Sequence, residues 1–139
     1  MISLEDAMKK PAPAPDADTA TFWRGMREGI LLLQHCCDCG HVQYYQQGMC
    51  RNCCGENLAH RPASGHGRVH SFSVVYRAPG PAFKADVPYA VLLVELDEGP
   101  RMISTYTGGG PDEVTFDMEV RLICEKVTDE VTLPRFTRA

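Results

Sequence analysis

The chain has 139 residues, and its 14 Lys and Arg residues against 18 Asp and Glu residues leave a formal net charge of −4 at pH 7. No basic run appears, which argues against nonspecific nucleic-acid binding, because such binding depends on clustered cations that neutralise phosphates. No apolar stretch reaches membrane-spanning length and no signal-peptide core opens the chain, so these features and the spacing of the seven cysteines favour the reducing cytoplasm.

Residues 1–20 are expected to form a flexible tail. Residues 11–18 read PAPAPDAD, and alternating Pro and Ala cannot form a helix and stay extended. An alternative is that Ile2, Leu4 and Met8 dock on a partner at the end of this tether.

Residues 19–29 are expected to form a helix. Thr19 is a suitable N-cap, and Gly29 is a suitable stop because glycine readily adopts the left-handed conformation that ends helices. Trp23, the one tryptophan, is expected to pack against the body of the protein rather than to stack on a ligand. Residues 30–34 form a short apolar run, which predicts a strand leading into a cysteine-rich segment.

Two Cys-x-x-Cys pairs lie between residues 35 and 57, a segment that holds six of the seven cysteines. Each such turn directs two thiolates at one point, and two turns complete the four sulfur ligands of a structural zinc site. The expected ligands are Cys36, Cys39, Cys50 and Cys53. The odd cysteine count disfavours disulfides, and the lack of a βαβ pattern disfavours a redox dithiol. Four thiolates leave no open position for substrate, so no metal catalysis is expected.

The register of the two pairs has alternatives, because Cys37 and Cys54 each stand beside an expected ligand. Using Cys54 would widen the second pair to Cys-x3-Cys, and using Cys37 would narrow the first pair to Cys-x-Cys. Both spacings make poorer metal-binding turns than Cys-x-x-Cys. His35 and His41 flank the site and are expected to be bystanders or to contact the ligands from outside.

From Gly67 onward the sequence pattern predicts strands. They are expected at residues 68–77, 88–97, 101–107, 119–126 and 130–136. The preceding residues 58–62 have the character of a brief extended link. Five strands joined by hairpin-like links, with no strong helix among them, suggest a small antiparallel barrel of the OB type.

Several blocks of sequence, in their order, resemble a known family: FWRGMREGILLLQHCCDCG, the second cysteine turn, GHGRVHSFSVV, PYAVLLVELDEGPR and the closing LPRF. They are similar to the acyl-CoA-associated family that joins a rubredoxin-like zinc ribbon to an OB-fold and is catalogued as a domain of unknown function. The resemblance implies a mainly β chain with an N-terminal helix, the zinc ribbon and a five-stranded antiparallel OB-fold barrel. The expected division is a flexible tail at 1–20, the helix plus zinc ribbon at 21–62 and the OB-fold domain at 63–139.

The resemblance also implies a partner and a function. Members of the family resemble non-catalytic companions of thiolase-fold enzymes that act on acyl-CoA thioesters. The expected role is therefore an accessory subunit that stabilises an acyltransferase or aldolase and helps form its acyl-CoA site, in a hetero-oligomer with two copies of each subunit. Structural Zn²⁺ and a shared CoA thioester are the expected cofactor and ligand. Two alternatives stay open: a nucleic-acid-binding protein and a stand-alone acyl-CoA-binding protein.

Three positions depart from the pattern of the family. A Pro-Pro-Arg-like stretch is usual where this chain has Gln-Gln-Gly at residues 46–48. The second cysteine turn usually closes as Cys-x-x-Cys-Gly, whereas here Cys54 precedes Gly55. A glycine is common at the position of Asp117, in the turn before the fourth barrel strand.

No catalytic residue is expected. Cys124, the one cysteine outside the ribbon, lies in a strand at a core-facing phase and is expected to be a small buried hydrophobe. The loop at residues 78–87 is a candidate rim for the CoA thioester, because Phe83 suits the apolar pantetheine arm and the cations Arg77 and Lys84 suit the diphosphate. A mobile loop with one solvated lysine is the competing interpretation.

Overall fold

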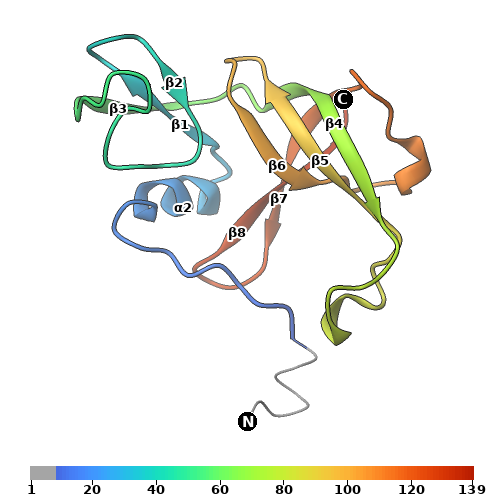
Figure 1. The fold of residues 1–139 in the computed structure, drawn as a ribbon. Coiled ribbons are helices and arrows are strands. Elements are labelled where there is room, and N and C mark those ends of the chain that lie inside the picture. Colours follow the sequence, from blue (N-terminus) through green and yellow to red (C-terminus); the bar gives the residue numbers. More distant parts are fainter. Residues whose placement is uncertain (1–8) are drawn as a thin grey trace.

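The structure is a computed structural model, and it describes residues 9–139. The expectations for residues 1–8, including docking by Ile2, Leu4 and Met8, lie outside the described residues. Figure 1 shows a small sheet with long loops on one side, a five-stranded barrel on the other side, and helix α2 (Ala20–Arg27) next to the small sheet.

Helix α2 confirms the expected helix and its expected end. Gly29 has a φ of +79°, and the amides of Gly29 and Ile30 donate to the carbonyls of Met26 and Gly25. These bonds pair carbonyl groups that a helix end otherwise leaves free. Within residues 9–139, none of the helices has the length and apolarity needed to cross a lipid bilayer.

The described part of the N-terminal segment is tied to its surroundings at two places. The carboxylate of Asp16 accepts hydrogen bonds from the amide and the hydroxyl of Thr19, both at 2.9 Å, and these bonds lower the pKa of Asp16. The ammonium of Lys10 lies 2.6 Å from the carboxylate of Asp86 and 5.7 Å from the ring centroid of Phe83. Residues 9–19 therefore run from α2 to the loop that precedes the second barrel strand.

The ribbon is a three-stranded antiparallel sheet in the order β2-β1-β3. Its strands are β1 (Leu32–Cys36), β2 (Val42–Gln43) and β3 (Leu58–Pro62). Residues 58–62 were expected to be only a brief extended link between the ribbon and the barrel. That expectation is wrong, because all five residues form strand β3 and pair with β1. Since three of these five residues are exposed, no alternation of apolar and polar side chains marks the strand in the sequence.

The barrel is a five-stranded antiparallel sheet in the order β6-β5-β4-β7-β8, and it curves until its outer strands nearly meet (Figure 1). Its strands are β4 (His66–Val75), β5 (Tyr89–Leu96), β6 (Arg101–Thr105), β7 (Glu119–Lys126) and β8 (Thr132–Arg138). The predicted mainly β architecture of helix, ribbon and OB-type barrel is confirmed, and β7 has the expected bounds.

The two outer strands, β6 and β8, meet only near the end of β6 within the described chain. A parallel bridge joins Tyr106 to Phe136, and the amide of Thr107 donates to the carbonyl of Phe136 at 2.8 Å. The hydroxyl of Ser104 donates to the carbonyl of Pro134 at 2.7 Å. The start of β6 has no such contact, so the barrel stays open there.

One apolar core extends from α2 through the ribbon into the barrel. Its fully buried members come from all three: Phe22, Met26, Leu33, Leu92, Val94, Val120 and Phe136. Trp23 belongs to this core, with its ring edge-on to Phe22 at 4.9 Å between centroids, which confirms the packing role expected for it. The ribbon and the barrel therefore share buried surface.

The expectation that Cys124 is buried is wrong, because Cys124 is exposed. On the same face of β7, Val120 is fully buried and Leu122 is partly buried, so the side chains become more exposed from Val120 to Cys124. The cause is that β7 pairs with β4 only up to Arg121, whereas its pairing with β8 continues to Lys126. Beyond Arg121 the strand leaves the barrel wall, and alternation no longer implies burial.

Candidate functional site

Four cysteine sulfurs meet within the ribbon. The Sγ atoms of Cys36, Cys39, Cys50 and Cys53 all lie within 4.8 Å of one another. The Cys36–Cys53 and Cys39–Cys50 sulfur pairs are each 3.6 Å apart. In a tetrahedral site with Zn–S bonds of about 2.3 Å, neighbouring sulfurs lie about 3.8 Å apart. The four sulfurs that the sequence singled out are therefore brought together in one cluster, in which two pairs have nearly the spacing of a tetrahedral zinc site.

The backbone of the two cysteine turns explains why these four sulfurs converge. In the first turn, the amide of Gly40 donates to the carbonyl of Cys36 at 2.9 Å, and the amide of Cys36 donates to the carbonyl of His41 at 2.8 Å. The second turn repeats both bonds at the same lengths. Cys37 and Cys54 remain exposed and lie outside the cluster, so the Cys-x-x-Cys register is the one that the fold adopts.

Hydrogen bonds shift the pKa values of two of the sulfurs in opposite directions. The side chain of Asn52, followed by the backbone of His41, lowers the pKa of Cys39 to about 6. The amide of Gly55 acts to lower the pKa of Cys53, but hydrogen bonds to the neighbouring sulfurs raise it to about 12. A bound divalent cation would deprotonate the coordinating thiols and neutralise the repulsion between four thiolates this close together. The donor set fits Zn²⁺, and four sulfur ligands leave no position for water or substrate.

Buried glutamines hold the chain between the two cysteine turns, a feature that the sequence analysis missed. The Nε2 of Gln43 donates to the Oε1 of Gln34 at 2.8 Å and to the carbonyl of Met49 at 3.1 Å, and its Oε1 accepts from the amide of Arg51 at 2.9 Å. Gln46 is buried as well and donates to a carbonyl of β1. The sequence feature that could have indicated this network is the presence of four glutamines between residues 34 and 47.

The departure from the family pattern at Cys54 coincides with a strained backbone. Cys54 has a φ of +63°, and Gly40, at the corresponding place of the first turn, has a φ of +79°. Asp117, where the family commonly has glycine, has a φ of +64°. A side chain in this left-handed region costs energy that glycine avoids.

We expect that Cys54→Gly stabilises the zinc-loaded protein by about 1 kcal/mol, because glycine relieves the left-handed strain without touching a sulfur of the cluster. Urea unfolding at fixed zinc concentration measures the change. Cys54→Ala is the matched control, since it removes the thiol but keeps the Cβ, and it should leave stability nearly unchanged. An equal gain from both substitutions would show that the thiol, and not the backbone, is the source of the strain.

The residues of the expected CoA rim do not all face one cavity. Phe83 lines a groove of about 520 Å³ between β6, β8 and the loop before β5. Arg77 and Lys84 are exposed, and neither lines this groove. The cations that do line it are Lys10 and Arg135, which the sequence analysis did not single out. Their proximity cannot be predicted from the sequence, because the two residues lie near opposite ends of the chain.

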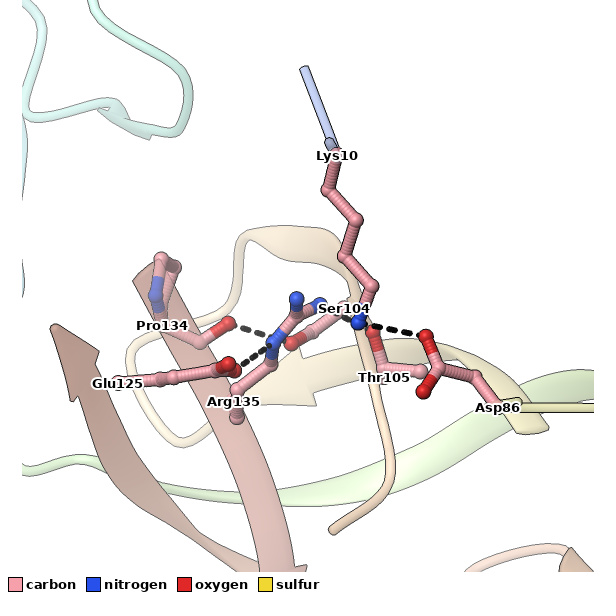
Figure 2. Close-up of polar contacts among 7 residues, drawn as sticks. All are labelled: Lys10, Asp86, Ser104, Thr105, Glu125, Pro134 and Arg135. Carbon is pink, nitrogen blue, oxygen red and sulfur yellow. Dashed lines mark hydrogen bonds and ion pairs between the residues drawn. The ribbon is translucent and has the colours of Figure 1, made fainter. Parts of the chain in front are cut away.

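Figure 2 shows the polar contacts in this groove. The guanidinium of Arg135 donates to the carboxylate of Glu125 at 2.8 Å and to the hydroxyl of Thr105. Lys10 forms its ion pair with Asp86 at the opposite side. Both cations are thus paired with carboxylates, which neutralise the positive charge that an anionic ligand would meet in the groove.

Two family models match the chain over consecutive segments. The model described as the ChsH2 rubredoxin-like zinc ribbon domain matches residues 23–59, and that of the ChsH2 C-terminal OB-fold domain matches residues 60–124. Among curated proteins, a DUF35 domain-containing scaffold protein of Pyrococcus furiosus is 32% identical, with 78% of this chain and 79% of that protein aligned. The corresponding scaffold protein of Methanothermobacter thermautotrophicus is 34% identical, with 81% and 86% aligned.

A longer relative and two solved structures extend the comparison. A probable enoyl-CoA hydratase alpha subunit of Thermomonospora curvata is 33% identical over 94% of this chain, but this chain spans only 40% of that protein. A chain of the structure described as Ltp2-ChsH2(DUF35) aldolase is 32% identical, with a TM-score of 0.81 over 91% of this chain and 98% of that chain. A DUF35 protein of unknown function from Sulfolobus solfataricus shares the fold, with a TM-score of 0.63, 13% identity and 86% and 83% of the two chains aligned.

Proposed function

The chain belongs to the DUF35 family, whose members join a ChsH2-type zinc ribbon to an OB-fold, and from this membership we propose that it is a non-catalytic accessory subunit of an enzyme that acts on acyl-CoA thioesters. The proposed partner is a thiolase-fold acyltransferase or aldolase, in a hetero-oligomer with two copies of each subunit. The thiolase fold of the partner rests on the resemblance of the sequence blocks described above.

The observation that carries the proposal is the similarity to the Ltp2-ChsH2(DUF35) aldolase chain over 91% of this chain and 98% of that chain. A likeness that spans both chains almost completely includes the helix, the ribbon and the barrel together. The scaffold proteins among the relatives support a role in holding other proteins. The relative described as a probable enoyl-CoA hydratase alpha subunit supports acyl-CoA chemistry in the complex, although this chain spans only 40% of it.

The ribbon contributes rigidity in this proposal. Zn²⁺ bound by Cys36, Cys39, Cys50 and Cys53 would hold the two cysteine turns together without taking part in chemistry. The proposed organisation keeps residues 21–62 as the helix-and-ribbon unit and residues 63–139 as the OB-fold unit, preceded by a tail at 1–20.

Arg77, Phe83 and Lys84 remain the proposed rim of a CoA-thioester channel that the partner completes. Phe83 is half-buried in the groove along β6, which suits contact with an apolar arm. Arg77 and Lys84 are exposed and form no ion pair within residues 9–139, so both cations are available to phosphate groups.

We expect that the tagged chain, purified from its own host, brings with it a thiolase-fold enzyme subunit in equal amount and carries one zinc ion per chain. Mass spectrometry identifies the companion, and elemental analysis of the same sample measures zinc. Turnover of CoA thioesters by the purified complex then tests the rim: the double variant with Arg77→Ala and Lys84→Ala should lower kcat/KM, whereas Lys126→Ala, another exposed lysine, should not.

Purification of the chain alone, or together with nucleic acid, would contradict the accessory-subunit function. Unchanged turnover by the double rim variant would contradict the proposed CoA rim but would leave the proposed accessory function standing.

A further inference from the structure

Strand β6 presents one edge of its backbone to β5 and the other edge outward. The amide of Tyr106 donates to the carbonyl of Ala90 in β5 at 3.1 Å. Backbone groups along an antiparallel strand alternate in direction, so the even-numbered residues of β6 share this orientation. The N–H and C=O groups of Arg101 and Ile103 therefore point away from β5.

That outward edge has no partner in the described part of the chain. In the sheet order of residues 9–139, β6 is an edge strand with β5 as its one paired neighbour, and the bridge to β8 lies beyond the end of β6, at Tyr106. The side chain of Ile103 is 70% exposed in the middle of this edge. Folded proteins usually protect an open edge with a bulge, a proline or a covering segment, because an open edge pairs with other chains.

Hollows lie on both sides of this edge, and Ile103 lines both of them. One is the groove of about 520 Å³ shared with β8. The other, of about 460 Å³, lies between β6 and the ribbon, with Trp23, Tyr45 and Leu93 among its lining residues. An additional strand beside β6 would therefore have space for its side chains and an apolar surface to contact.

The hollow beside the ribbon also carries positive charge. Arg51 and Arg101 both line it. The guanidinium of Arg51 donates to the carbonyls of Tyr44 and Tyr45 and forms no ion pair within residues 9–139. Arg101 has only a loose pairing with Glu95, at 3.6 Å. An acidic side chain at this place would meet two cations.

We propose that the free edge of β6 binds an extended segment of the partner enzyme subunit as an added β-strand. The main-chain groups of Ile103 pair with that segment, an apolar residue of the segment packs against Ile103 and the hollow beside Trp23, and an acidic residue faces Arg51 and Arg101. The identity of the bound segment rests on the proposed function, because the segment belongs to the enzyme subunit of the proposed complex. The strand contact itself goes beyond that function.

A single extended chain fits this place better than a second copy of the protein. The ribbon and α2 stand on the side of β6 that faces away from β5 (Figure 1). A second copy that offered its own β6 would bring its own ribbon and α2 into the same space, whereas a lone strand adds no second ribbon or helix.

Two substitutions at one position separate main-chain pairing from side-chain docking. Ile103→Pro removes the outward N–H, and because that N–H does not bond to β5 the barrel keeps its ladder. Ile103→Thr keeps the N–H and the branched shape. With the enzyme subunit that co-purifies with the wild-type chain as the probe, we expect about tenfold weaker binding for the proline variant and less than about threefold for the threonine variant. Zinc content and thermal unfolding of both variants verify that they are folded.

Hydrogen exchange of individual amides provides the independent measurement. In the free chain the amide of Ile103 should exchange much faster than those of Met102 and Ser104, which bond to β5, and in the complex it should slow by at least about 100-fold. A complex that forms while the Ile103 amide still exchanges freely, or equal losses for the two variants, would overturn the strand contact and leave the proposed function standing. Self-association through β6 in sedimentation would assign the edge to a second copy instead. If no enzyme subunit binds, both proposals fall.

Discussion

Cys50→Ser is expected to abolish zinc binding and to unfold the ribbon. Cys50 is fully buried, and its sulfur lies 3.6 Å from that of Cys39 within the four-sulfur cluster. Structural zinc contributes an apparent binding free energy of about 10–16 kcal/mol in zinc-finger peptides, and in such small units it is folding free energy. Strand β2 has only two residues and three of the five residues of β3 are exposed, so little apolar burial can replace the metal. Zinc per chain should fall from one to near zero in elemental analysis.

Cys37→Ser is the matched control for this prediction. Cys37 lies next to a proposed ligand but is exposed and outside the cluster, so its replacement should leave zinc content and thermal unfolding unchanged. Zinc retained at one ion per chain in Cys50→Ser, or lost equally in Cys37→Ser, would contradict the ligand set. Removal of zinc from the wild-type chain by a chelator should unfold the ribbon in the same way as Cys50→Ser is expected to do.

Phe22→Ala is expected to lower the free energy of unfolding by about 3–5 kcal/mol, the usual cost of truncating a fully buried phenylalanine. Phe22 has no exposed surface, and its ring lies edge-on to Trp23 and Tyr45 with centroids 4.9 Å and 5.2 Å away. The substitution leaves a cavity where α2, the ribbon and the barrel share their core. Urea unfolding of the zinc-loaded protein measures the loss.

Phe116→Ala serves as the control for aromatic truncation. Phe116 is 68% exposed and touches the ring of Phe72 at 4.9 Å, so its removal should cost no more than about 1 kcal/mol. Similar losses for Phe22→Ala and Phe116→Ala would show that α2 does not anchor the shared core.

The zinc cluster and the groove differ in how far they could be predicted from the sequence. The four cysteines were predictable because a Cys-x-x-Cys turn is a local structure whose backbone bonds span only a few residues. The strand at 119–126 was predictable because apolar residues alternate along it. Lys10 and Arg135 were not predictable as neighbours of one groove, because 125 positions separate them and only the path of the chain brings them together.

By itself, then, the sequence determined the elements that carry local or periodic information: the helix with its glycine stop, the two cysteine turns, the barrel strands and the family to which they belong. Only the tertiary structure decided which strands become neighbours. That choice makes β3 a ribbon strand, leaves Cys124 exposed where β7 departs from the barrel, and leaves the outward edge of β6 open at Ile103. The physical reason is that pairing and burial depend on segments distant in the chain, and no local pattern of side chains records which segment lies beside another.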